Sequence, residues 1–234
     1  MKIHRELQQK SWDWFQARAG KVTGSELGSL ITDKGKIRDW KTAMPNSYVC
    51  RKVAEKWRGA PLESFQGNRQ TDQGNLWEEK ARKYFSALLD REIEQVGGIE
   101  SDDGWLWVSP DGVFGESGIE LKCPNADTHV GWLSDGDVVP EEHVLQCQFA
   151  LYVTGWSEYR FGSFVSDMPH LLVTVTPIPG MAETISEALF GFRSRFTAVW
   201  NLLCDRNGGP PAPKPVFVPT PGPVKFSWDM DDDD

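Results

Sequence analysis

Cysteine and histidine are scarce in this sequence of 234 residues, and neither is spaced as in a metal site. The four cysteines form no C-x-x-C pair, and the four histidines show neither H-x-x-x-H nor His-Cys spacing. These absences argue against a zinc centre. We expect free, buried thiols in a reducing compartment rather than catalytic cysteines. The cysteines are Cys50, Cys123, Cys147 and Cys204.

Long apolar runs are also absent. No segment is apolar over enough residues to span a bilayer, and no basic-then-apolar leader follows Met1. We therefore expect a soluble, unsecreted protein of the cytoplasm with no membrane partner. With 39% hydrophobic and 25% charged residues, the chain can form one sizeable domain with its own core.

The sequence lacks the net positive charge that is expected of a nucleic-acid-binding protein, because its formal charge is -9. The distribution of charge is uneven. Residues 1–60 hold 13 lysines and arginines against 6 aspartates and glutamates, a net of +7, so the remainder sums to -16. One basic lobe on an acidic body is compatible with DNA that enters from one side only.

Proline is concentrated near the C-terminus, where seven of the fifteen prolines lie between Pro210 and Pro223. Such a stretch predicts an extended linker rather than a folded segment. It leads to an acidic end with Phe226, Trp228 and five aspartates. We expect one folded domain over residues 1–206 and a disordered tail over 207–234, which serves either as a tethered docking peptide or as a solubilising end.

Apolar periodicity predicts an α/β domain with a mixed central sheet flanked by helices. Helical patterns run over Leu27 to Ile31, Pro45 to Gly59, Thr71 or Asp72 to Asp90, Pro140 to Gly155 and Met181 to Cys204. Strand-like runs cover Ser157 to Val165 and His170 to Thr176, and a polar connection is expected from Pro124 to Pro140. The expected apolar stripe of the helix before Asp90 consists of Trp77, Ala81, Tyr84, Phe85 and Leu88.

The chain is organised around the segment from Val108 to Pro124, which we predict to be a hairpin. Strand-like runs at Trp105 to Val108 and Ile119 to Cys123 flank a glycine-rich tip. Alternation in the second strand places Glu120 and Lys122 on one face, and Asp111 can reach that face from the end of the first strand.

Two carboxylates about 4 Å apart repel by roughly 4 kcal/mol at an effective dielectric near 20, so a cation between them would stabilise the arrangement. Magnesium accepts one or two carboxylates together with substrate phosphate oxygens. Lys122 would then act as a point charge beside a scissile phosphate or the attacking water. The residues alone leave open a surface hairpin with solvated charges.

Ser-Pro-Asp-Gly at residues 109–112 followed by Glu-Leu-Lys-Cys-Pro at residues 120–124 resembles the phage lambda exonuclease family of viral recombination nucleases, within the PD-(D/E)xK superfamily. The resemblance implies a PD-(D/E)xK nuclease-like core. It also implies an enzyme that hydrolyses one strand of linear double-stranded DNA from the 5' end and leaves a 3' overhang for strand annealing. Two Mg2+ ions, with Mn2+ as a substitute, would be held by Asp111, Glu120 and Leu121, beside the catalytic Lys122.

A second segment extends the resemblance to an end-binding site. Arg18 with Val-Thr-Gly-Ser at residues 22–25 resembles the family segment whose arginine and serine hold the 5'-phosphate. Arg18 and Ser25 inherit that role by the match, and Ser109 is a third candidate. A helix N-terminus with a nearby arginine is a ready phosphate site, although a capped helix, with Thr23 or Ser25 as its N-cap, and a surface arginine would give the same pattern.

Two further matches lie on predicted helices. Gly-Asn-Leu-Trp-Glu-Glu-Lys-Ala-Arg at residues 74–82 resembles the family helix with an acidic metal-site residue, which makes Glu78 a third carboxylate. Gln148 and Tyr152 resemble the Gln-x-x-x-Tyr motif of the superfamily and are assigned to the catalytic site. Gln146 competes for the role of the glutamine, and a solvated Glu78 and a surface pair on the helix remain open.

The resemblance also implies partners: a ring-shaped homotrimer, a single-strand annealing protein, and expression by a phage or prophage in a bacterial host cell. Two other functions remain open. The same core could belong to a site-specific endonuclease or junction resolvase, and the basic lobe alone could serve a non-catalytic module that binds DNA ends.

Overall fold

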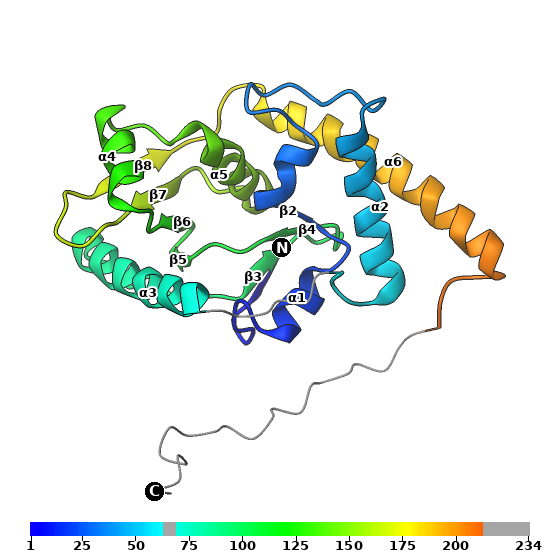
Figure 1. Ribbon diagram of the computed structural model, residues 1–234, viewed down its shortest axis with the longest axis horizontal. Coiled ribbons are helices and arrows are strands. Elements are labelled where there is room, and N and C mark those ends of the chain that lie inside the picture. The colour runs from blue at the N-terminus through cyan, green and yellow to red at the C-terminus, as the bar shows by residue number, and fades with distance from the viewer. Residues whose placement is uncertain (63–68, 213–234) are drawn as a thin grey trace, which may run out of the picture.

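The computed structural model describes the backbone of residues 1–62 and 69–212 and the side chains of residues 1–62 and 76–212. The acidic end and most of the predicted linker, residues 213–234, therefore lie outside the described residues. Figure 1 shows an α/β arrangement in which strands at the centre are covered by helices. The expected α/β class with mixed strands and flanking helices is confirmed.

The strands form two four-stranded mixed sheets rather than one central sheet. The first sheet has the order β1-β3-β4-β2, and β2 is parallel to β4. Its strands have only two or three residues each, which is too few for an alternation pattern. The sequence therefore indicated only β4. They are β1 (Lys2–His4), β2 (Val22–Thr23), β3 (Gly98–Glu100) and β4 (Leu106–Val108).

The second sheet has the order β5-β6-β7-β8, with β6 and β7 parallel. Its strands are β5 (Gly112–Phe114), β6 (Ser117–Lys122), β7 (Tyr159–Ser163) and β8 (Leu171–Val175). The last two confirm the predicted strands. Gly115, at a φ of 57°, provides the left-handed residue in the tight turn between β5 and β6.

The predicted hairpin has the wrong strand pairing. β4 lies in the first sheet, and β5, from the segment expected as a loose tip, pairs with β6. The physical reason lies at Pro110, which has no N–H and cannot continue a ladder. The chain leaves the first sheet at Pro110. The backbone N–H of Asp111 then donates to the carbonyl oxygen of Ile119, a residue of β6 in the second sheet, at 3.0 Å.

The longer helices end where the sequence indicates. α2 (Ala43–Arg58) ends at Gly59 with φ at 63°, and α5 (Glu141–Thr154) ends at Gly155 with φ at 71°. α6 (Met181–Asn207) extends slightly beyond its predicted end and buries Ile185, Leu189, Phe192 and Phe196. α1 (Trp12–Arg18), α3 (Arg69–Leu89), α4 (Ala126–Ser134) and the 3-10 helix η1 (Gly24–Ser29) complete the described helices.

Two expectations on helices are wrong. The segment expected as a polar connection contains α4, whose N-cap Asn125 accepts a hydrogen bond from the backbone N–H of Thr128 at 3.3 Å. On α3, Ala81 and Phe85 are buried as predicted, but Tyr84 and Leu88 are exposed. The buried stripe is therefore narrower than the pattern suggested.

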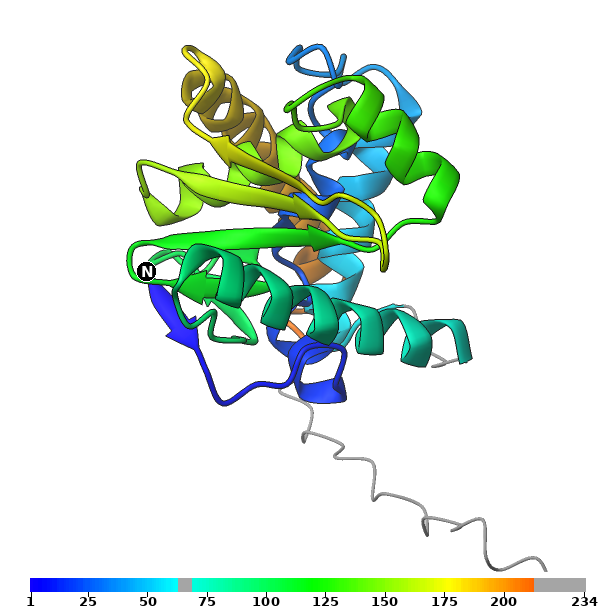
Figure 2. The same cartoon turned by 90° about the vertical axis from the view of Figure 1, so that its left-hand side faces the viewer.

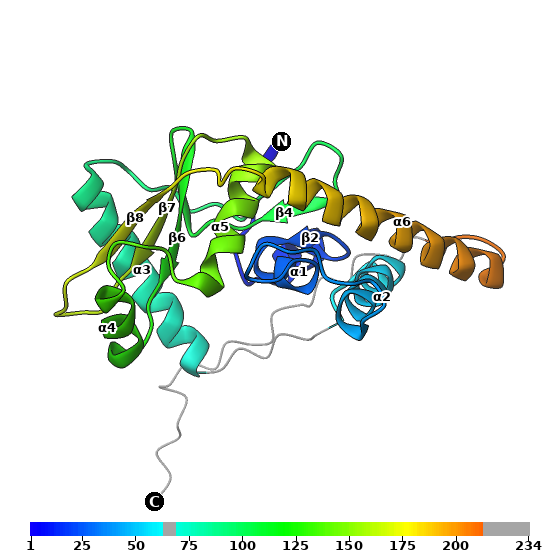
Figure 3. The same ribbon diagram turned by 90° about the horizontal axis from the view of Figure 1, so that it is seen from above.

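Helices cover both faces of the second sheet. Figures 2 and 3 show α3 along one face and α5 on the opposite side of the strands. Ala81 and Phe85 of α3 pack with Ile119 and Leu121 of β6 in a small core cluster. The main cluster brings residues of α2, α5 and α6 together with both sheets. Because neighbouring strand residues face opposite ways, Glu120 points toward α5.

No described helix is long and apolar enough to cross a membrane. The cysteines among the described residues are free, as expected. Cys147 is buried, and burial raises the pKa of its thiol, which fits a structural residue. Cys50 is exposed, contrary to the expectation of buried thiols, because it lies on the outward side of α2.

Candidate active site

The hairpin of β5 and β6 brings two carboxylates into one cleft. Glu120 lies in β6 and is 4% exposed. Asp111 lies just before β5, and its Oδ2 accepts a hydrogen bond from the backbone N–H of Leu121 at 2.6 Å. This bond ties the loop between the two sheets to the C-terminal part of β6. The side chain of Leu121 faces α3, so only its backbone lies on the side of the carboxylates.

A lysine and a glutamine bind the same oxygen of Glu120. The Lys122 ammonium and the Gln146 amide nitrogen each lie 2.5 Å from Glu120 Oε1. Lys122 shares a strand face with Glu120, and Gln146 reaches it from α5. Both contacts fix the orientation of the carboxylate before any substrate binds.

The electrostatics of this cluster are dominated by burial. Burial and the charges of Glu120 and Glu78 raise the pKa of the Asp111 carboxyl well above its ordinary value. Burial also raises the pKa of Glu120, against the opposing effect of Lys122. Burial lowers the pKa of Lys122, but Glu120 and Asp111 outweigh it, so that the net pKa is raised and the ammonium stays charged.

The donor set suits a hard cation. Within the described part of the chain, hydrogen bonds to the pair use Oδ2 of Asp111 and Oε1 of Glu120, which leaves Oδ1 and Oε2 without a donor. Free carboxylate oxygens are the ligands that magnesium and calcium prefer. Among the side chains of residues 1–62 and 76–212, no group of three or more from histidine, cysteine, aspartate and glutamate is arranged to hold a metal.

Glu78 lies near this pair but does not converge with it. Its two oxygens bind Arg82 at 2.9 Å and Lys10 at 3.0 Å. Arg82 also donates through Nε to the backbone oxygen of Asp111 at 2.8 Å. The expected third carboxylate therefore reaches Asp111 through Arg82, and its own oxygens are already ion-paired.

Arg18 lines the cleft from α1, on the side of the first sheet. Its guanidinium carbon lies 4.2 Å from the centre of the Trp14 ring. No hydrogen bond or ion pair joins that guanidinium to another residue that the structure describes, so a cation is held here without a bonded anion. Burial lowers the pKa of Arg18, against the raising effect of Glu26 and other acidic groups.

Ser25 is exposed at the start of η1, a 3-10 helix where an α-helical pattern was expected. Thr23 occupies the N-cap position without a capping side-chain bond, because its hydroxyl donates to Glu26 at 2.8 Å. Ser109 follows β4 and accepts hydrogen bonds from two indole N–H groups.

A cavity of about 150 Å³ joins these groups. Its lining includes three predicted phosphate-binding residues and two predicted metal ligands, which are Arg18, Ser25, Ser109, Asp111 and Glu120. These residues come from α1, η1, β6 and the connection between the sheets. The fold thus brings together residues that are widely separated in the sequence.

The structure does not bring Gln148 into contact with the carboxylate pair. Its amide nitrogen donates to the carbonyl of Thr176 at 2.8 Å, and its oxygen accepts from the backbone N–H of Ile178 at 2.9 Å. Gln148 therefore anchors the connection from β8 to α6. Tyr152, on the same helix, packs against the main core cluster. The competing glutamine, Gln146, is the one that contacts Glu120.

Sequence reasoning missed other residues that support the cleft. Gln9 donates to the carbonyls of Val96 and Pro110 at 2.9 and 2.8 Å, and so holds the connection between the sheets. Arg82 ends the motif at residues 74–82, but the resemblance assigns a role only to Glu78 of that motif. No spacing signal identifies Gln9, since its partners are backbone atoms distant in sequence.

Solved structures place the fold in a class. Two structures of LHK-Exo, an alkaline exonuclease from Laribacter hongkongensis, one of them in complex with dAMP, match with a TM-score of 0.71 and 24% identity. Each match covers 85% of this chain and 98% of the other. A phage-related exonuclease from Haemophilus somnus matches with a TM-score of 0.57 and 15% identity over 78% of this chain and 96% of its own. The chain thus has the fold of these exonucleases.

The family follows from the sequence itself. Residues 13–157 match the model of the YqaJ-like viral recombinase domain, and the chain belongs to this family. The expected family of viral recombination nucleases is thereby confirmed. No curated protein matches. The matched range contains every residue that the sequence analysis assigned to the site.

Proposed function

We propose that this DNA exonuclease of the viral recombinase family degrades one strand of linear duplex DNA from its 5' end and leaves a 3' overhang for recombination by strand annealing. The observation that carries the proposal is the single cleft that Arg18, Ser25, Ser109, Asp111 and Glu120 line together. A terminal phosphate bound at one end of this cleft places the neighbouring phosphodiester near the carboxylates at the other.

Asp111 and Glu120 would hold a divalent metal, and the backbone of Leu121 would complete its ligands. Their free oxygens, Oδ1 and Oε2, suit magnesium, with two ions and Mn2+ as a substitute in the proposed form. When bound, the metal supplies charge at the phosphoryl oxygens and an acidified water. Glu78, held by Lys10 and Arg82, would add negative charge near the metal.

The protein's own groups prepare this end of the cleft. Gln146 and Lys122 bind Oε1 of Glu120, so Oε2 is directed away from them toward a ligand. The charged Lys122, whose side chain is 28% exposed, can approach a phosphate oxygen and stabilise the negative charge that develops on it. Each group therefore positions or neutralises charge rather than forming a covalent bond.

The other end would recognise the terminal phosphate. Arg18 offers a planar fork of donors that is not engaged by any bonded anion in the described residues. Ser25 and Ser109 add hydroxyl groups to the same lining. A phosphate monoester carries more charge than an internal diester, so this end favours a 5'-phosphorylated terminus.

One gel tests the proposal. Linear duplex with a labelled 5'-phosphate or 5'-hydroxyl end is incubated beside a closed circle, with Mg2+, with Ca2+ or with EDTA. We expect degradation of the phosphorylated linear substrate in Mg2+ alone, because Ca2+ binds but imposes a looser geometry. Cleavage of the closed circle would indicate an endonuclease or resolvase instead. Binding of ends without degradation in any metal would indicate a non-catalytic module.

The proposal extends to assembly and location. We propose a homotrimer, a single-strand annealing protein as partner, and action in the cytoplasm of a bacterial host cell that carries the phage or prophage. Sedimentation of the purified protein measures the oligomeric state. Truncation after Arg206 tests the proposed domain over residues 1–206 and the docking role of residues 207–234, because exonuclease activity should persist while co-purification of the annealing protein decreases.

A further inference from the structure

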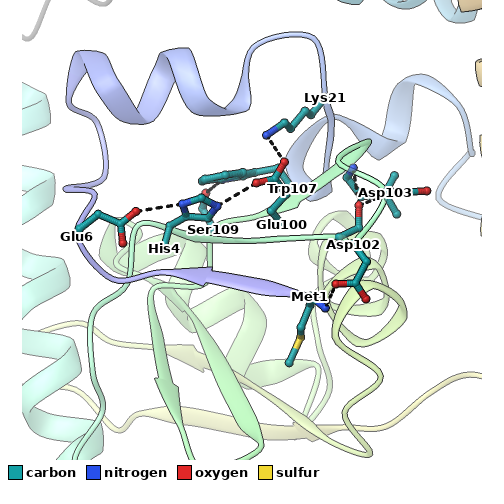
Figure 4. A network of polar contacts seen from close by, with 11 residues as sticks. Met1, His4, Glu6, Lys21, Glu100, Asp102, Asp103, Trp107 and Ser109 are labelled. Carbon is teal, nitrogen blue, oxygen red and sulfur yellow. Dashed lines mark hydrogen bonds and ion pairs between the residues drawn. The ribbon is translucent and has the colours of Figure 1, made fainter.

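We propose that Trp107 and Trp14 are positioning residues that make the Ser109 hydroxyl a dedicated hydrogen-bond donor to the terminal phosphate. This inference rests on the proposed function of the cleft. The indole N–H of Trp107 donates to Ser109 Oγ at 2.8 Å, and the indole N–H of Trp14 donates to the same oxygen at 3.2 Å. Figure 4 shows Trp107 beside Ser109.

The two indole bonds exhaust the acceptor capacity of Ser109. A serine hydroxyl has one O–H to donate and two lone pairs to accept with. Both lone pairs are engaged by indoles, which have no acceptor and cannot take the serine proton in return. None of the described residues accepts that proton, so the O–H of Ser109 remains for a ligand in the cleft.

Trp107 is held firmly enough to act as a fixed donor. It is fully buried, and its ring centre lies 4.9 Å from that of His4. The Lys21 ammonium lies 5.0 Å from the ring and is ion-paired with Glu100, which also contacts His4 (Figure 4). A Cβ at Gly98 would lie 2.4 Å from the indole, so only glycine at this position leaves room for the ring.

Trp14 links Ser109 to Arg18. Its indole N–H is shared between two acceptors, the carbonyl oxygen of Gly97 at 2.7 Å and Ser109 Oγ at 3.2 Å. Its hydrogen bond to Ser109 is therefore weaker than that of Trp107. The face of the same ring carries the guanidinium of Arg18 at 4.2 Å. One side chain therefore places two donors, a charged and a neutral one, toward the same cleft.

The chemistry of the ligand follows from this arrangement. A group that can only donate is matched by an acceptor, and a phosphate monoester offers strong acceptor oxygens with negative charge. A terminal hydroxyl is a weaker acceptor and carries no charge. Trp107 and Trp14 thus contribute to the preference for a phosphorylated end without touching the substrate.

The test compares rates on 5'-phosphorylated and 5'-hydroxyl duplex. Trp107→Phe removes the indole N–H, and the ratio of kcat/KM for the two ends should fall by about three- to tenfold, as expected for one net hydrogen bond. Trp14→Phe keeps a ring under Arg18 and should lower the ratio less. Trp105→Phe is the matched control, since its ring packs on Phe196 at 5.0 Å, and should leave the ratio unchanged.

A double-mutant cycle separates positioning from general destabilisation. In a Ser109→Ala background, Trp107→Phe should have no further effect on the ratio, because its partner is already gone. An equal fall of the ratio in both backgrounds, or no fall in the wild-type background, would overturn the inference. If neither Arg18→Ala nor Ser109→Ala changes the ratio, the proposed phosphate site itself fails, which is a different result.

Discussion

The two ends of the cleft are built in opposite ways. At the carboxylate end, Asp111 and Glu120 stand close to the second sheet, bound to a backbone N–H, a lysine and an amide. At the phosphate end, Arg18 stands on a short helix beside the first sheet, stacked on an aromatic ring and bonded to no described anion. One end has surplus negative charge and the other an unengaged positive charge.

The difference shows what each end requires from a ligand. Burial raises the pKa of Asp111 and of Glu120, which means that their ionised forms are costly without a cation. Arg18 keeps donors for which the described residues offer no acceptor. A metal at the first end and a phosphate at the second would remove both imbalances, and variants that change one end alone should separate the two functions.

The largest expected effect is at the carboxylate end. Asp111→Ala, Glu120→Ala and Lys122→Ala should each reduce cleavage of linear duplex by at least about 10²-fold, because each removes charge at the reacting phosphate. Folding and binding of DNA should persist, as measured by circular dichroism and gel shift. Substantial residual cleavage by Asp111→Ala would be incompatible with the site assignment.

The phosphate end should show a smaller and more selective effect. Arg18→Ala removes charge-assisted hydrogen bonds and should lower the preference for a 5'-phosphate by about 10- to 100-fold, with a smaller loss on 5'-hydroxyl ends. Kinetics on the two substrates measure this. Arg58→Ala, at an exposed arginine at the end of α2, is the control. An unchanged preference would exclude Arg18 from the phosphate site.

The two glutamines of α5 sharpen the comparison further. Gln146→Ala should reduce turnover by about tenfold, because it removes the partner that orients Glu120. Gln148→Ala should leave turnover nearly intact but lower the free energy of unfolding by about 1–3 kcal/mol, because Thr176 and Ile178 lose buried partners. Denaturant titration beside steady-state kinetics tests both; the reverse pattern would restore Gln148 to the site.

The last expected effect is on stability without metal and leaves the phosphate end untouched. Asp111→Asn keeps an acceptor for the Leu121 N–H and removes one of two neighbouring charges, so it should stabilise the metal-free protein by about 1–3 kcal/mol. Mg2+ should stabilise the wild type and not this variant, since binding favours the folded state. Thermal unfolding with and without Mg2+ reports both. Equal Mg2+ shifts in the two proteins would place the metal elsewhere.

The sequence predicted the long elements well, because their periodicity extends over several turns. α2, α5 and α6 were all expected, the first two with glycines at their ends. The strands β1, β2 and β3 are too short for such a pattern, and α4 begins at Asn125 in a segment rich in polar residues. The pairing of β4 was missed because Pro110 separates two sheets, which only tertiary structure reveals.

The site was predicted in part for a similar reason. Motif spacing within one strand suffices to predict that Glu120 and Lys122 meet, and Nζ of Lys122 lies 2.5 Å from Oε1 of Glu120. It does not distinguish Gln146 from Gln148, since the two residues lie on one helix and differ in what other elements place beside them. The role of Gln9 depends on backbone atoms, and that of Trp14 on the hydroxyl of Ser109, all far away in the sequence.

The connection between the two sheets has a further consequence. Ser109 and Asp111 are separated only by Pro110, and both line the cleft. In the proposed function, the residue that binds the chain end and the residue that binds the metal are thus joined by two peptide units, of about 3.8 Å each between Cα atoms. Covalent geometry then sets the distance between the bound terminal phosphate and the scissile phosphodiester. Relative movement of the two sheets would alter this distance little.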